Sequence, residues 1–147
     1  MIIQGTHEFP RPSAQVFEAL IDPVILQQAI PGCEKLEKTA EDEYLAHLKI
    51  GIAAVKGTYA GKVRLSDKQP PNQFTLLMEG QGTPGFVKGT ARIVLREKGQ
   101  TTELHYTADV QVGGLIAAVG SRMVEATAKK LAGDFFQRFS QALERRK

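Results

Sequence analysis

Residues 103–112 read ELHYTADVQV, in which a polar side chain alternates with an apolar or small one. A period of two is typical of a strand with one buried and one wet face. The same alternation appears upstream in residues 44–52, 55–65, 74–78 and 87–96. Short turn-forming stretches join these segments at residues 41–42, 68–72 and 98–100. Because no helical pattern of about ten residues separates them, the sequence predicts antiparallel hairpins.

Outside this region the periodicity is different. Residues 2–9 indicate a further strand, and two short helices are expected after it, the first with Pro12 at its first position and the second over residues 24–30. From Leu115 to about Arg145 an apolar side chain recurs every three or four residues, which predicts one long helix with a bend at Gly120 or Gly133. The apolar stripe of this helix comprises Ile116, Val119, Met123, Val124, Ala128, Leu131, Phe135, Phe139 and Ala142.

The order of these elements predicts an α+β fold of the helix-grip type. An antiparallel sheet of six to seven strands twists and curls, so the long C-terminal helix is expected to lie in its concave face. At 147 residues the chain is expected to form a single domain, residues 1–147, and it is long enough to bury a core without a disulfide or metal.

Composition excludes several classes of protein. The chain is 42% hydrophobic and 24% charged, which is typical of a globular protein and not of a disordered one. The net charge of +3 is too small for a nucleic-acid-binding field. A single cysteine, the absence of a long apolar run and the absence of a signal pattern lead us to expect a cytoplasmic protein.

Small residues recur on the apolar side of the predicted strands, at Gly57, Gly61, Gly80, Gly82, Gly85, Gly89, Ala91 and Ala108. Glycine is unfavourable inside strands, so each position needs a reason. Either these glycines allow close approach or bulges, or they leave the concave face unfilled; we give the two interpretations equal weight at any one position. Unfilled apolar space costs about 24 cal/mol per Å³, so a cavity that is retained is expected to hold a guest.

We therefore expect a hydrophobic ligand between the sheet and the long helix. The expected lining residues are Tyr59, Val63, Phe74, Leu76, Met78, Val87, Ala91, Ile93, Tyr106, Ala108, Val110, Val119, Met123 and Phe135. The hydroxyl of Tyr59 or Tyr106 is expected to orient a polar headgroup. The long helix, with a hinge at Gly113-Gly114, is expected to act as the lid.

The sequence contains no catalytic constellation that we can identify. His7, His47 and His105 are far apart and do not fit the spacing of metal ligands, so we expect no metal site and no cofactor. Six basic residues near the C-terminus indicate a solvated helix face, with weak contact to an anionic membrane as an alternative: Lys129, Lys130, Arg138, Arg145, Arg146 and Lys147.

Several segments carry a resemblance to a known family. They are Ile30-Pro31-Gly32-Cys33, VKGTYAGKV at 55–63, GQG at 80–82, GFVKG at 85–89, TTELHY at 101–106, VGGLI at 112–116 and Phe135-Phe136. Over nearly its whole length the chain resembles the carbon monoxide dehydrogenase G-subunit family, within the START-like (SRPBCC, Bet v 1-like) helix-grip superfamily.

This resemblance implies an accessory protein for an aerobic carbon monoxide dehydrogenase-type molybdenum hydroxylase. Members are linked to maturation, membrane recruitment or quinone delivery, and the implied ligand is a quinone such as menaquinone, or a lipid. Many members carry a membrane-binding extension after the long helix, and because this chain ends at Lys147 we expect at most weak contact with the inner face of the membrane. Two alternatives stay open: a small polyketide-cyclase-like enzyme, with His7 and the tyrosines as acid–base candidates, or an interaction factor for molybdenum enzyme assembly.

Overall fold

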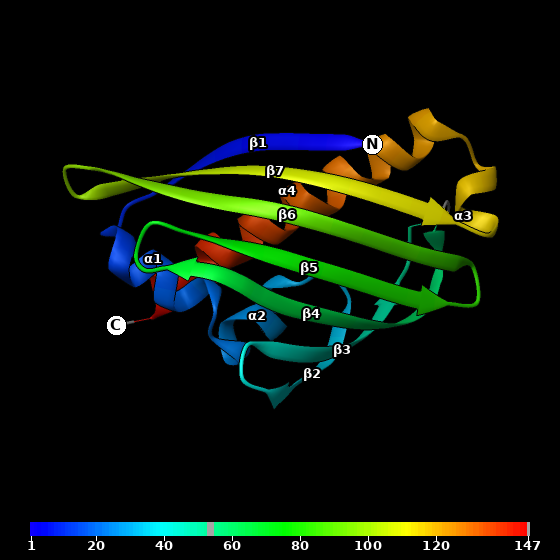
Figure 1. Cartoon of the computed structure of the whole chain (residues 1–147), viewed down its shortest axis with the longest axis horizontal. Coiled ribbons are helices and arrows are strands. Elements are labelled where there is room, and N and C mark those ends of the chain that lie inside the picture. The colour runs from blue at the N-terminus through cyan, green and yellow to red at the C-terminus, as the bar shows by residue number, and fades with distance from the viewer. Residues whose placement is uncertain (53–54, 147) are drawn as a thin grey trace.

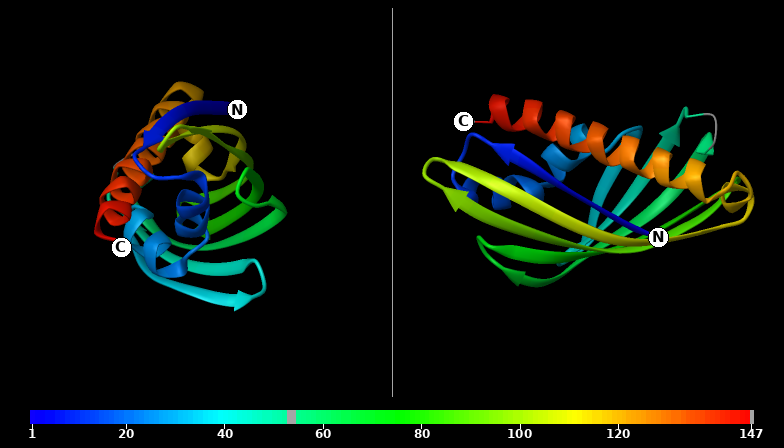
Figure 2. Two further views of the ribbon diagram at one scale, coloured as in Figure 1. Left: turned by 90° about the vertical axis from the view of Figure 1, so that its left-hand side faces the viewer. Right: turned by 90° about the horizontal axis from the view of Figure 1, so that it is seen from above.

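The computed structural model of the chain describes residues 1–52 and 55–146. Within these residues, seven strands form one antiparallel sheet in the order β1-β7-β6-β5-β4-β3-β2. The sheet is strongly curved (Figure 2). Its strands are β1 (Ile2–Phe9), β2 (Cys33–Ala40), β3 (Glu43–Ile50), β4 (Gly57–Gln69), β5 (Gln73–Gly82), β6 (Gly85–Lys98) and β7 (Thr101–Gly113).

Helices cover the concave side of this sheet. Two short helices, α1 (Ser13–Leu20) and α2 (Pro23–Ala29), connect β1 to β2. The longest helix, α4 (Ser121–Arg145), follows β7 and lies along the open side of the curved sheet (Figures 1 and 2). The helix-grip architecture expected from the sequence is confirmed.

The long helix is interrupted at Gly120, one of the two positions where a bend is expected, but its apolar stripe differs from our prediction. A four-residue helix, α3 (Leu115–Ala118), comes first, and Gly120 separates it from α4 with a φ of 98°. This left-handed backbone is readily adopted only by glycine, and it ends the helical register there. The expected continuous stripe is therefore wrong at Val119 and Met123, whose side chains are 41% and 51% exposed. Gly133, by contrast, lies within α4 without interrupting it.

The buried apolar residues form two separate clusters. We call the first the main core; it joins α1, α2 and the second half of α4 to the sheet and includes Phe9, Phe17, Phe74, Leu104 and Phe139. We call the second the small core; it lies at the other end, where α3 meets the sheet, and comprises Ile50, Val55, Tyr59, Ile116 and Val124. The central part of the concave face lies between these two clusters.

Hydrogen bonds fix the C-terminal end of α4. The Arg11 guanidinium donates to the carbonyl oxygens of Leu143 (2.9 Å) and Arg146 (2.8 Å) at the end of the helix, and the Leu143 carbonyl also accepts from the Arg146 amide at 3.2 Å. The side chain of Arg146 pairs in turn with Asp22 just before α2, at 3.1 Å. The C-terminal end of α4 is thus anchored beside α1 and α2. Its other end depends on α3 and the small core.

Candidate functional site

The centre of the concave face is poor in side chains. Gly61 and Gly80 are direct partners on β4 and β5, and Gly89 on β6 is paired with Met78. A Cβ atom placed on Gly80 would meet no atom of the described residues within 4 Å. A Cβ on Gly61 or Gly89 would have as its nearest neighbours only atoms of adjoining strands. The helix α4 therefore does not come within 4 Å of a Cβ atom at Gly80.

The side chains around this space are only half buried, although they point to the inner side of the sheet. They are Val63, Leu76, Met78, Val87 and Val110. On α4, Ala128, Leu131 and Phe135 share a helical face with the buried Val124, and they too are half buried. Inward-facing side chains that keep solvent exposure border open space. We call the space between the two cores, above Gly80, the inner hollow.

The fourteen residues that we expect to line the ligand site do not all lie together in the structure. Val63, Leu76, Tyr106 and Phe135 are half buried and pack against the main core, Val87 packs against the small core, and Met78 and Val110 are half buried between them. Phe74 and Ile93 are buried in the main core, and Tyr59 is buried in the small core. Ala91 and Ala108 are buried partners on β6 and β7. Val119 and Met123 are exposed outside the space between the sheet and α4, because Gly120 interrupts the helix.

The two tyrosines differ in the state of their hydroxyl groups. The Tyr59 hydroxyl donates to the carbonyl oxygen of Val55 at 2.5 Å, so it has no second proton to donate to a ligand. The Tyr106 hydroxyl makes no hydrogen bond within the described parts of the chain and is not fully buried, and the partial burial of Tyr106 raises its pKa. The Tyr106 ring lies over Gly5, where a Cβ atom would be 2.8 Å from the ring. Of the two candidates for orienting a headgroup, only Tyr106 keeps a free donor.

His7 belongs to an aromatic stack with Phe136 and Tyr106. Its ring lies 4.2 Å from that of Phe136 on α4, and Phe136 also stacks on Tyr106, with ring centroids 5.3 Å apart. A groove of about 400 Å³ runs beside His7 between β1 and α4 and is lined on the helix by Gly133, Gln137 and Ser140. Because the imidazole is partly removed from water, burial lowers the pKa of His7.

This shift predicts a pH-dependent stability. A histidine whose folded pKa lies below its ordinary value of about 6.5 binds fewer protons in the folded than in the unfolded protein. The free energy of unfolding should therefore be highest above pH 6.5 and fall as the pH drops from there through the lowered pKa. The His7→Phe variant keeps the stack on Phe136 and should lose this slope. Urea unfolding at pH 7.5, 6.5 and 5.5 measures it; equal slopes in both proteins would contradict the prediction.

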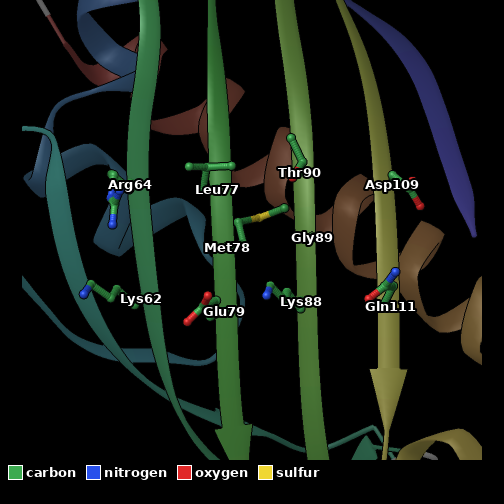
Figure 3. A pocket seen from close by; sticks show the side chains of 10 residues that line it. All are labelled: Lys62, Arg64, Leu77, Met78, Glu79, Lys88, Gly89, Thr90, Asp109 and Gln111. Carbon is green, nitrogen blue, oxygen red and sulfur yellow. The ribbon is translucent and has the colours of Figure 1, made fainter.

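A second hollow, of about 530 Å³, lies on the outer face of the sheet (Figure 3). Its wall consists mostly of outward-facing polar and charged side chains, and among them are Lys62, Arg64, Glu79, Lys88, Asp109 and Gln111. Lys62 pairs with Glu43 at 2.6 Å. Such a charged, water-facing surface cannot bury an apolar ligand well, so the inner hollow is the better candidate.

The remaining expectations concern metals and the basic C-terminal residues. Among the described residues, no three His, Cys, Asp or Glu side chains are grouped closely enough to hold a metal ion. Lys129 pairs with Glu125 and Lys130 with Asp134, each one helical turn away. Lys147 lies outside the described residues. Within the described chain, the helices are too short or too polar to span a bilayer.

Comparison with known proteins gives the following matches. The model of the family described as the G-subunit of carbon monoxide dehydrogenase (CoxG) matches residues 5–144. A crystal structure of a conserved protein from Geobacillus kaustophilus is 40% identical, with a TM-score of 0.95, and the alignment covers 99% of this chain and 96% of that one. A START superfamily protein from Mycobacterium smegmatis is similar in fold at 18% identity, with a TM-score of 0.68 and coverage of 99% and 95%.

The Zhui aromatase/cyclase from Streptomyces sp. R1128 is also similar in fold, at 16% identity, with a TM-score of 0.71 and coverage of 99% of this chain and 94% of that one. At that identity the likeness concerns the fold alone. No match was found among the curated proteins.

Proposed function

The chain belongs to the CoxG family of carbon monoxide dehydrogenase G-subunits, and on that premise we propose that it is a non-enzymatic accessory protein that binds a quinone or lipid in the inner hollow. The observation that carries this proposal is the open space above Gly80, where a Cβ atom would meet nothing within 4 Å. A protein that leaves apolar space unfilled loses stability unless a guest occupies the space.

The chemistry of the lining favours an oily ligand with one polar group. Valine, leucine and methionine side chains surround the hollow, so affinity comes mainly from apolar burial, at about 25 cal/mol per Å² removed from water. Met78 has the flexible thioether that adapts to an irregular guest. The free hydroxyl of Tyr106 can donate one hydrogen bond to a carbonyl oxygen, such as that of a quinone. These features support an apolar ligand that carries one hydrogen-bond acceptor.

Binding is better supported than catalysis because the rings of two acid–base candidates, His7 and Tyr106, stack with their centroids 6.1 Å apart and share no hydrogen bond within the described chain. His7 stacks on Phe136, and Tyr59 donates to a backbone carbonyl. General acid–base catalysis needs such groups within hydrogen-bond reach of one reacting atom. For the partner we propose a molybdenum hydroxylase of the aerobic carbon monoxide dehydrogenase type, on the basis of family membership.

Native mass spectrometry of the purified protein, followed by organic extraction, tests the proposed function. We expect a mass above that of the polypeptide and a lipophilic molecule in the extract. If the protein is purified without a ligand, added menaquinone in detergent-free buffer should bind with one-to-one stoichiometry. A bare polypeptide mass together with no uptake of menaquinone or phospholipid would contradict the proposal.

A further inference from the structure

The two edges of the sheet differ in how readily they can accept a further strand. At one edge, β2 has shifts of register after Cys33 and after Lys38, and it carries the side chains of Lys35 and Lys38. Bulges and lysine side chains hinder the addition of a strand at a sheet edge. At the other edge, β1 pairs with β7 without a shift from Ile2 to Phe9 and contains no lysine, arginine or proline. β1 is therefore the more open of the two edges.

Alternate residues of β1 direct their backbone groups away from β7. The Val110 amide donates to the Met1 carbonyl oxygen at 2.8 Å, and the Met1 amino group donates to the Val110 carbonyl oxygen at 3.2 Å. Every second residue of an antiparallel pair repeats this arrangement, so the odd-numbered residues of β1 are those bonded to β7. The N–H and C=O groups of Gln4, Thr6 and Glu8 point to the free edge instead, where β1 has no neighbour among the described strands.

A groove adjoins this free edge where β1 comes near α4. It is the groove of about 400 Å³ described above, which extends from Glu8 and Phe9 across to Gly133, Gln137 and Gln141 on the helix. A Cβ atom on Gly133 would meet nothing within 4 Å of it in the described chain. The amide side chains of the two glutamines can donate to and accept from a peptide backbone. The groove therefore offers room and polar partners to an extended chain.

Glu8 gives the free edge a negative charge. Its carboxylate accepts from the Thr101 hydroxyl at 3.0 Å, and it forms no salt bridge with the described cations. Its partner across the ladder, Glu103, is already paired with Lys98 at 2.7 Å. Because opposite charges on adjacent strands attract, a basic side chain on an added strand would complement Glu8.

We propose that β1 binds an extended segment of a partner protein, which adds to the sheet as a further strand. Side chains alternate along a strand, so a residue opposite Glu8 lies on the outer face and the next residue faces the space at Gly133. The segment that fits therefore has a basic residue next to an apolar one. A second copy of the chain fits less well, because it would bring a whole sheet, whose β7 would meet α4 across the groove.

Selection from a phage-displayed library of random nonapeptides tests the inference with the full-length protein. We expect the retained peptides to alternate basic or polar residues with apolar ones. A selected peptide, synthesised with a fluorescein label, measures affinity by anisotropy. When it binds, hydrogen exchange should slow chiefly at the amides of Gln4, Thr6 and Glu8, because those of Gly5 and His7 are already bonded to β7. This alternation distinguishes strand addition from binding at another surface.

A proline at position 6 tests the role of the free backbone groups. Thr6→Pro removes one N–H from the free edge and leaves the bonds to β7 in place, which an edge strand tolerates. It should weaken peptide binding at least about tenfold. Thr6→Val is the matched control: both variants lose the hydroxyl that lies 3.1 Å from His105 Nδ1, but valine keeps the N–H. Thr6→Val should bind like the unchanged protein.

Two further variants test the groove and the charge. Gly133→Phe fills the groove from α4 and should also weaken binding at least about tenfold, whereas Gly133→Ala should change it little. Glu8→Lys should change the selected peptides from basic to acidic. Glu79→Lys, which reverses an exposed charge on β5, should leave the selection unchanged.

The inference is overturned if no peptide is selected, or if a folded Thr6→Pro protein binds as well as Thr6→Val. If Thr6→Pro does not fold, equal binding by Gly133→Phe and Gly133→Ala overturns it. It also fails if light scattering finds a dimer that either disruptive variant dissociates, because a second copy would then cover β1. Menaquinone uptake is a separate readout: we expect Thr6→Pro to retain it, and an unchanged protein that binds peptide but not menaquinone would contradict the proposed function alone.

Discussion

Gly80→Phe should abolish uptake of a quinone or lipid while the protein stays folded. A Cβ at this position meets nothing within 4 Å, so the added ring has room to enter the inner hollow. Once there, it occupies the volume proposed for the ligand, and we expect affinity to fall at least about a hundredfold. Phenylalanine also suits a strand better than glycine does, so the free energy of unfolding should stay the same or rise. Titration with menaquinone and urea unfolding measure the two effects.

The adjoining residue provides a matched control. Gln81 lies next to Gly80 on β5, and its exposed side chain belongs to the opposite face, so Gln81→Phe adds the same ring outside the grip. Menaquinone uptake should be unchanged in Gln81→Phe. It should be only slightly weakened in Gly80→Ala, which adds a single methyl group. Full uptake by a folded Gly80→Phe protein would mean that the ligand binds elsewhere. Ala108 is less suitable for such a test, because it is already buried and a large side chain there would disturb the core.

The glycines show which part of the candidate site can be predicted from the sequence and which part cannot. Alternation along β3 to β7 was sufficient to predict the sheet and its inner face, because one buried face imposes a period of two. At each glycine, however, close packing and empty space were equally good explanations. The structure separates them: a Cβ on Gly82 would collide with the carbonyl oxygen of Thr58, whereas one on Gly80 meets nothing. That difference depends on neighbours across the sheet and on the path of α4, which local sequence does not encode.

The burial of the apolar stripe on the long helix and the hydrogen bonding of the two tyrosines also cannot be predicted from the sequence alone. A period of 3.6 continues through Val119 and Met123, but the left-handed backbone of Gly120 removes both from the buried face. Tyr59 and Tyr106 are equivalent in the alternating pattern, yet only Tyr59 has a carbonyl acceptor, from Val55, within reach. The exposure of Phe86 and Leu115 is likewise not predicted by the sequence, in which both belong to apolar segments. Phe86 lies against the backbone of Gly113, two residues before Leu115, and this closeness depends on the pairing of β6 with β7.

Gly85→Ala should be among the most destabilising single substitutions in this chain. Its Cβ would collide with the carbonyl oxygen of Gly113, and its φ of 141° is one that alanine rarely adopts. The backbones of Gly85 and Gly114 meet here with no room for a side chain on either. We expect a loss of about 3 to 4 kcal/mol in the free energy of unfolding, measured by urea denaturation.

Gly99→Ala separates the two causes of that loss. Gly99 also has a positive φ, of 65°, but a Cβ there would meet nothing within 4 Å, so only backbone strain is added. This variant should lose about 1 kcal/mol. If Gly85→Ala loses no more than Gly99→Ala, the contact between the turn at Gly85 and Gly113 does not hold this end of the sheet together. A larger loss means that the close packing of the Gly85 backbone on the Gly113 backbone stabilises this end of the sheet. The position of α3, which directly follows Gly113, then depends on this packing.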